Sequence, residues 1–308
     1  MNKQYGAIVH TTIPFNNQLK LDENAYRGHL RRLGEAGLSV YIGAAGAGEG
    51  NTLTREERDR VLAIGVEELK GKVVVRAAGT EPRDTREMVE FLKSAEALKV
   101  DAAQIYSMDM GHGVLPNRKE IEHFFRTSIE ATSLPVTISN QKKVGYPIPM
   151  DFVEDLAKRY PNFAGYAYDV SDMFYMMELL RRFGDRLEIY ASGVGNAMFA
   201  LGMGACGFQG MEGNIAPKLF ASVVTGFVNK DIALMHESFR KVMRLHAILK
   251  NPVRENQRAI KPVLNAYGLG GGQIRPPRIA ISGQELEDVI AAIEALEIPE
   301  MASWKRQQ

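Results

Sequence analysis

Short apolar runs alternate with longer amphipathic stretches along most of the chain. The apolar runs have the length of buried strands, and the amphipathic stretches carry apolar residues three and four positions apart, as on one face of a helix. In the stretch 84–99 this spacing is followed by Met88, Phe91, Leu92, Ala95 and Leu98. The pattern predicts repeated β/α units, with strands at residues 5–11, 38–45, 72–79, 101–108, 134–140, 162–169, 187–193 and 206–212.

Two amphipathic stretches, 24–37 and 54–71, are bounded by residues that commonly cap the ends of helices. Asp22 precedes the first stretch as a capping residue. Thr54, with Glu57 three residues later, forms a capping box at the start of the second. Gly37 and Gly71 close the two stretches, where a helix end favours a left-handed residue. These signals predict two helices.

Eight repeated units favour closure of the sheet into a (β/α)8 TIM barrel, with an open doubly wound sheet as the structural alternative. The strand pattern then stops, and three more helical patterns follow at 231–250, 251–268 and 283–296. No low-complexity linker separates the two parts. We therefore expect a barrel over residues 1–228 and a C-terminal three-helix domain, residues 229–308, packed on the barrel.

The composition is that of an ordinary globular protein of enzyme size, with 45% hydrophobic and 24% charged residues. The 38 Lys and Arg residues balance 37 Asp and Glu residues, so neither a nucleic acid nor a membrane surface is expected as a partner. No apolar run approaches the roughly 20 residues of a membrane span, and the first residues lack a signal-peptide pattern. The single cysteine, Cys206, excludes an internal disulfide and favours the cytoplasm.

Candidate chemistry is expected at the carboxyl ends of the strands, where barrels of this kind carry their active sites. The Gly-rich stretch 43–50 follows the second strand. Its backbone N–H groups could cradle an anion, or the glycines could serve a tight turn. The spacing is not that of a nucleotide-binding loop. Both interpretations stay open at this point.

Three segments of the chain have the motifs of a known family and occur in the same order as in that family. They are GAAGAGEGNTLTREER (43–58), LGMGACGFQGMEGNIAPKLF (201–220) and NPVRENQRAIKPVLNAYGL (251–269). They resemble the dihydrodipicolinate synthase / N-acetylneuraminate lyase superfamily. The resemblance implies a TIM barrel with a three-helix C-terminal domain and a homo-oligomer, a tetramer or a dimer. Members are mostly lyases and aldolases that act on pyruvate and other 2-oxo acids through a lysine Schiff base.

The same resemblance places unusual residues at the positions of the family's catalytic groups. Residues 165–172 align without a gap to the strand that carries the Schiff-base lysine, whose position falls on Ala167. The position of the catalytic tyrosine falls on Ser139, and those of the two threonines that hold the substrate carboxylate fall on Ala44 and Ala45. The comparison with the family thus predicts a lyase-like enzyme with a non-standard mechanism.

One hypothesis is general acid–base chemistry on a small, anionic, carboxylated substrate similar to a 2-oxo acid. The expected catalytic groups are Glu212, Asp169 and Tyr106, with Glu49, Asp109 and His112 as further candidates. Glu212 is favoured, because a carboxylate beside apolar residues such as Phe208 and Met211 suits proton transfer. Alternatively, Glu212 is a partly solvated carboxylate that caps a backbone turn. His112 is alternatively a histidine of a flexible loop without a catalytic role.

A second hypothesis assigns the amine to Lys142 or Lys143, after the fifth strand, where the family often has an arginine. Either lysine would form an ion pair with a substrate carboxylate or would form the imine. Lys143 is the catalytic candidate of the two. A third hypothesis is a relative that binds a small molecule without catalysis. The polar residues Gln209 and Glu212 argue against it, because they are retained at a barrel mouth that bulky apolar residues could have filled. The expected substrate-binding residues are Ala44, Ala45, Gly46, Glu49, Ser139, Asn140, Lys142, Ala167 and Gln209.

No cofactor and no metal are expected, because the chain lacks the His and Cys spacing of a metal site. A Mg²⁺ ion would need only a few carboxylates. Glu49, Asp169 and Glu212 could supply them only if their loops converge.

Overall fold

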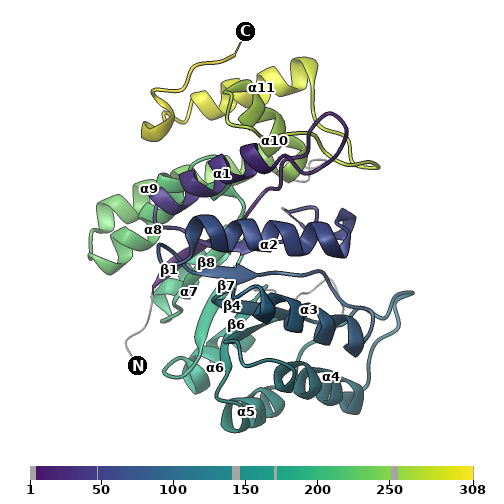
Figure 1. The fold of residues 1–308 in the computed structure, drawn as a ribbon. Helices are drawn as coiled ribbons and strands as arrows, with labels where there is room; N and C mark the ends of the chain where they lie inside the picture. The colour runs from purple at the N-terminus through teal and green to yellow at the C-terminus, as the bar shows by residue number, and fades with distance from the viewer. Residues whose placement is uncertain (1–4, 47, 141–145, 170–171, 251–255, 308) are drawn as a thin grey trace.

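The computed structural model describes residues 5–46, 48–140, 146–169, 172–250 and 256–307. Within them, parallel strands pair in chain order and the last returns to the first, so that the sheet closes (Figure 1). The TIM barrel is confirmed, and the open sheet is wrong. The strands are β1 (Gly6–His10), β2 (Ser39–Ile42), β3 (Val75–Ala77), β4 (Ala102–Tyr106), β5 (Val136–Asn140), β6 (Phe163–Tyr168), β7 (Glu188–Ser192) and β8 (Gly207–Gly210).

A helix follows each strand on the outside of the barrel: α1 (Glu23–Glu35), α2 (Arg55–Leu69), α3 (Thr85–Ala97), α4 (Arg118–Glu130), α5 (Met150–Arg159), α6 (Met173–Phe183), α7 (Ala197–Gly202) and α8 (Pro217–Val228). The predicted helix starts are confirmed. Asp22 accepts a hydrogen bond from Ala25 N, and Thr54 forms its capping box with Glu57. Gly37 and Gly71 have φ values of 73° and 81°, which glycine adopts without steric cost.

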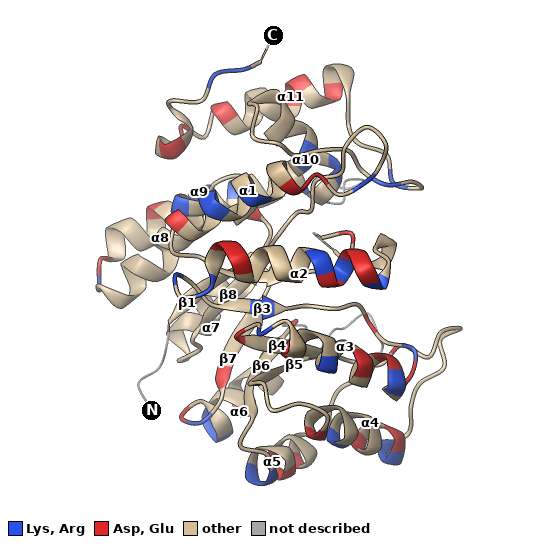
Figure 2. Cartoon of the chain, viewed as in Figure 1, with Lys and Arg blue, Asp and Glu red and all other residues tan. Residues whose placement is uncertain are grey.

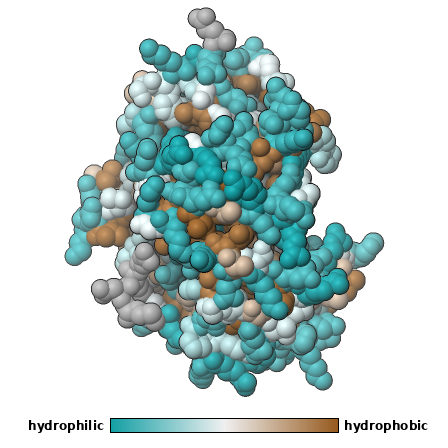
Figure 3. All heavy atoms as spheres, in the orientation of Figure 1, coloured by the Kyte–Doolittle hydropathy of each residue, from teal (hydrophilic) through white to brown (hydrophobic). Residues whose placement is uncertain are grey.

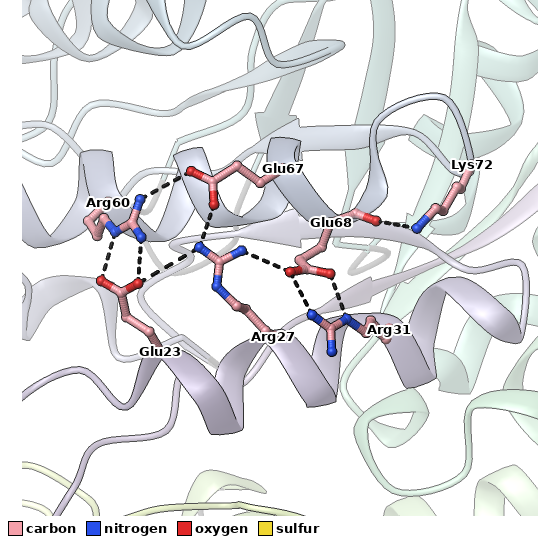
Figure 4. A network of polar contacts seen from close by, with 7 residues as sticks. All are labelled: Glu23, Arg27, Arg31, Arg60, Glu67, Glu68 and Lys72. Carbon is pink, nitrogen blue, oxygen red and sulfur yellow. Dashed lines mark hydrogen bonds and ion pairs between the residues drawn. The ribbon is translucent and has the colours of Figure 1, made fainter.

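The first two outer helices are joined by a network of ion pairs (Figure 4). Arg27 of α1 pairs with Glu67 and Glu68 of α2. Arg60 of α2 reaches back to Glu23 of α1 at 2.5 Å. Ion pairs near a protein surface contribute about 0–1 kcal/mol each, so the network adds modestly to the contact between the two helices.

Charged residues lie mainly on the outer helices, but β3 and β7 each carry one (Figure 2). These are Arg76 and Glu188, whose side chains approach to 3.1 Å between strands that are not neighbours in the sheet. Because Glu188 is the first residue of β7, the pair lies toward the amino end of the barrel. The interior of the barrel is therefore polar at this end, away from the strand ends that carry the candidate site.

Three helices follow the barrel: α9 (Ile232–Leu249), α10 (Asn256–Ala266) and α11 (Gly283–Glu294). α10 and α11 lie above the barrel in Figure 1. Buried side chains of all three helices, among them Leu245, Ile260 and Ile290, belong to the same hydrophobic cluster as the barrel core. The predicted helical extension is therefore present and packed, whereas its separation as a domain at residue 229 stays a prediction.

The outer surface is mostly hydrophilic on the face shown in Figure 3, where hydrophobic atoms gather in separate patches. Among the described residues, none of the helices has both the length and the apolar character required to cross a membrane.

Candidate active site

A cavity of about 600 Å³ opens at the carboxyl ends of the strands. This is the end at which barrels of this type place their chemistry. Part of the lining comes from strand ends and the loops after them, and part from the segments that follow the barrel. The described lining residues are His10, Ala44, Ala45, Gly46, Asn51, Glu81, Tyr106, Asp109, Asp169, Ser192, Gly193, Val194, Gln209, Gly210, Met211, Glu212, His246, Lys250, Asn256, Gln257 and Arg278.

Glu212 begins the short helical turn that follows β8, and its carboxylate contacts another residue of the lining. Its side chain is 2% exposed, and its Oε1 lies 2.6 Å from Nδ1 of His246 in α9. Its Oε2 accepts a hydrogen bond from Met211 N at 3.0 Å. A Cβ at position 210 would lie 2.6 Å from this Oε2, so Gly210 makes room for the carboxylate. The predicted candidate is therefore a buried carboxylate that holds an imidazole in place.

His246 was not selected from the sequence, because it lies within the helical pattern 231–250 with no motif around it. The carboxylate contact at Nδ1 leaves Nε2 as the nitrogen that can exchange a proton with a ligand. A carboxylate that orients an imidazole in this way is the usual support of a general base. Lys250, the residue that caps the C-terminal end of α9, also lines the cavity, so the end of this helix supplies both groups.

His10 and Gln209, from the neighbouring strands β1 and β8, form a second polar pair in the lining. Nε2 of His10 lies 2.8 Å from Oε1 of Gln209, and the imidazole stacks on Tyr41 with 5.2 Å between ring centroids. Burial lowers the pKa of His10 to about 4, although Gln209 and Glu212 oppose the shift. The ring is therefore neutral near pH 7.

The strand register aligns Tyr106, Ser139 and Ala167 on β4, β5 and β6. All three are buried, and of them only Tyr106 is part of the described lining. Burial raises the pKa of the Tyr106 phenol well above its ordinary value, so the hydroxyl keeps its proton at neutral pH. Asn140, another predicted binding residue, instead donates its side-chain amide to Tyr166 at 3.1 Å.

The Gly-rich stretch contributes Ala44, Ala45 and Gly46, three of the predicted binding residues, to the cavity wall, and their role in binding stays a prediction. Further along the stretch, the N–H groups of Gly48 and Gly50 both donate to the carbonyl of Ala44, each at 3.1 Å. A Cβ at position 50 would approach the carbonyl oxygen of Gly43 to 2.0 Å. This part of the stretch is thus a tight turn whose two N–H groups are already used.

Glu49 lies in that turn but is not part of the described cavity lining. It is fully buried, pairs with Lys261 of α10 and accepts a hydrogen bond from Arg275 N at 3.0 Å. Lys261 also donates to the carbonyl of Gln273 at 2.8 Å. Burial lowers the pKa of Lys261 to about 8, against the opposing effect of Glu49. Through its contacts with Lys261 and Arg275, Glu49 connects the loop after β2 to the segments that follow the barrel.

The described lining carries four carboxylates, on Glu81, Asp109, Asp169 and Glu212, and two basic groups, on Lys250 and Arg278. Lys142 and Lys143 lie outside the described residues. His112 is a loop residue with φ of 51° and is not among the described lining residues. Since Glu49 lies away from the cavity, the three carboxylates considered for Mg²⁺ do not converge. Across the described chain, no cluster of three or more His, Cys, Asp or Glu residues is placed to hold a metal ion.

Comparisons with known proteins agree with this architecture. The model of the dihydrodipicolinate synthetase family matches residues 3–296. A 4-hydroxy-tetrahydrodipicolinate synthase of Desulforamulus reducens is 26% identical over 290 residues, which cover 92% of this chain and 95% of that protein. A protein of Methylobacterium radiotolerans named "Probable 5-dehydro-4-deoxyglucarate dehydratase" is 28% identical over 294 residues, which cover 94% of each chain.

Solved structures match over nearly the whole chain as well. A dihydrodipicolinate synthase from Bacillus anthracis superposes with a TM-score of 0.86 at 20% identity and covers 96% of this chain and 99% of its own. The synthase from Aquifex aeolicus gives a TM-score of 0.85 at 20% identity, with coverage of 96% and 99%. These two matches establish the fold.

Proposed function

Because the chain belongs to the dihydrodipicolinate synthetase family, we propose that it is a lyase-like enzyme that transfers a proton to and from a small carboxylated substrate similar to a 2-oxo acid. Its full-length relatives include a synthase and a protein named as a dehydratase, which supports lyase chemistry in the broad sense. The observation that carries the proposal is the Glu212–His246 pair in the lining of the cavity.

The proposed step is proton abstraction from the carbon next to the substrate carbonyl. His246 Nε2 takes the proton, the C–H electron pair forms a C=C bond, and the carbonyl electrons move to oxygen to give an enolate. Glu212 holds the imidazole by Nδ1 and stabilises the imidazolium that forms. Return of the proton, or departure of a group from the next carbon, completes an exchange or an elimination.

A mechanism without the usual imine is proposed because the aligned lysine position is Ala167, a fully buried alanine on β6. Lys261, a buried lysine, does not compensate for it, since its amine contacts Glu49 outside the described cavity lining. The substrate carboxylate is assigned to Lys250 or Arg278, the Lys and Arg residues of the described lining. A homo-oligomer and a cytoplasmic location remain predictions from the family and from the composition.

The proposal is tested by hydrogen exchange in D₂O with pyruvate, 2-oxobutyrate and 2-oxoglutarate, following the C3 protons by proton NMR. Wild-type protein is expected to accelerate exchange for at least one acid, and His246→Gln to slow it by about 10²–10⁴-fold. His236→Gln is the matched control, because His236 lies in the same helix and is exposed. Failure of the wild type to exchange any of the three acids would contradict the proposal.

Borohydride trapping in the presence of the same acids separates this route from imine chemistry. Peptide mapping should find no lysine adduct. A stoichiometric adduct on Lys142, Lys143 or Lys250 would instead establish a relocated amine. Saturable binding of an acid without exchange or adduct would identify a non-catalytic relative.

A further inference from the structure

Gln209 carries a buried amide nitrogen that has no hydrogen-bond partner among the described residues. Its side chain lines the cavity, and the residue is 1% exposed. A buried donor without an acceptor is costly, and in native proteins such a group calls for an explanation, such as a ligand or a catalytic role. Because Gln209 lines the cavity, the missing acceptor is expected to be part of the substrate.

The geometry of β8 directs the Gln209 side chain into the barrel. The preceding residue, Phe208, packs against Phe220 of α8 on the outside, with ring centroids 4.8 Å apart. Successive side chains of a strand point to opposite faces, so Gln209 points inward. On the next strand, His10 holds the oxygen of the same amide at 2.8 Å. This contact fixes the amide plane and leaves both hydrogens of Nε2 for another acceptor.

His10 can hold the amide oxygen only with a proton on Nε2, which the neutral ring supplies. The burial that lowers its pKa to about 4 keeps the ring in this neutral form at the pH of the reaction. Its stacking on Tyr41 restrains the ring plane. His10 is thus a positioning residue for Gln209.

We propose that Gln209 Nε2 donates a hydrogen bond to the substrate oxygen that becomes the enolate oxyanion. This role rests on the proposed function, in which the C–H electron pair moves into a C=C bond and the carbonyl electrons move to that oxygen. The proton goes to His246 Nε2, and Gln209 keeps its own hydrogens throughout. A preorganised neutral donor in a buried site stabilises such a charge strongly, because it need not reorganise as the charge develops.

The donor role assigned to Gln209 also limits the chemical class of the ligand. It requires a planar acid in which an oxygen that accepts hydrogen bonds sits next to a carboxylate, the first facing Gln209 and the second facing Lys250 or Arg278. A 2-oxo acid in its enolate form meets these requirements.

Gln104 provides a comparison within the same barrel. This residue of β4 is fully buried, and both polar atoms of its amide lack partners among the described residues. Unlike Gln209, it is not part of the described cavity lining. Removal of the Gln104 amide should therefore change stability without changing ligand binding.

The test is calorimetric titration with oxalate, a planar dianion that resembles the enolate of a 2-oxo acid. Wild-type protein is expected to bind it, and Gln209→Met to bind it about 10–100-fold more weakly, as for loss of a hydrogen bond to a charged group. Gln209→Glu keeps the acceptor for His10 but replaces the donors with a negative charge, so it should bind oxalate still more weakly. Gln104→Met is the matched control and should bind like the wild type, with thermal unfolding as the check on folding.

Four results would overturn the inference: no oxalate binding by the wild type, unchanged binding by Gln209→Met, equal weakening by Gln104→Met, or wild-type affinity in Gln209→Glu. The C3 exchange assay separates this inference from the proposed function. Exchange that persists undiminished in Gln209→Met would contradict the donor role alone. Absence of exchange in the wild type, together with oxalate binding that depends on Gln209, would contradict the proposed reaction and support the donor.

Discussion

Glu49 and Glu212 are two buried carboxylates that follow strand ends of one barrel and have different partners. Glu49 is fully buried after β2 and pairs with the amine of Lys261. Glu212 is 2% exposed after β8 and contacts the imidazole of His246. Only Glu212 belongs to the described cavity lining. Burial at a strand end therefore does not by itself place a carboxylate in the cavity, and only Glu212 combines burial with a contact to another residue of the cavity lining.

The two partners also give the carboxylates different physical roles. The Glu49–Lys261 pair is closed to solvent, with further bonds to Arg275 N and Gln273 O, so it connects α10 to the loop after β2. Its contribution is to position the cavity wall. The Glu212–His246 pair keeps one imidazole nitrogen for a ligand, and histidine is the side chain that most readily exchanges protons near neutral pH.

The largest expected effect on stability is that of Glu49→Gln. The substitution leaves the Lys261 ammonium buried without its countercharge, which should lower the free energy of unfolding by about 3–5 kcal/mol. Urea unfolding followed by circular dichroism measures this change. A loss below about 1 kcal/mol, the range of exposed pairs, would mean that the pair is not a structural connection.

Glu212→Gln should reduce the exchange rate strongly and the stability only weakly, in contrast to Glu49→Gln. The C3 exchange rate is expected to fall about 100-fold, equivalent to about 2.7 kcal/mol in activation free energy, because the imidazolium loses its stabilising charge. The free energy of unfolding should fall by less than in Glu49→Gln, since the amide oxygen of the substituted side chain can still accept a hydrogen bond from Nδ1 of His246. A variant that unfolds easily but retains its exchange rate would remove the distinction between the two carboxylates.

A double-mutant cycle sharpens the comparison further. Glu49→Gln and Lys261→Met together remove both charges, so the double variant should be more stable than the sum of the single changes predicts, by about 1–3 kcal/mol. Urea midpoints of the four proteins give this coupling energy. Additive single changes would show that the two side chains do not depend on each other.

A further expected effect is a pH dependence of stability. The pKa of Lys261 is lowered from 10.5 to about 8 in the folded protein. Between these values the unfolded chain binds more protons, so the free energy of unfolding should rise with pH in this window. The rise is measured as the difference between wild type and Lys261→Met at each pH. A difference that stays constant from pH 8 to 10.5 would contradict the lowered pKa.

Much of the fold was predictable because its signals are local. The alternation of apolar runs and amphipathic stretches, the capping box at Thr54 and the left-handed Gly37 and Gly71 each depend on a few neighbouring residues. Parallel strands joined by helices have few ways to close, so the barrel followed from their number. Glu212 was placed correctly at the end of β8 for the same reason.

The sequence by itself thus determined the barrel, the strand ends that face the cavity and the candidate carboxylates, since chain-local periodicity and capping decide these features. Tertiary structure alone decided which carboxylate meets which partner. His246 joins Glu212 across 34 positions, and Lys261 joins Glu49 across 212. Such pairs depend on how α9 and α10 pack on the barrel, and this packing is driven by apolar burial that carries no information about the partner of a given charge.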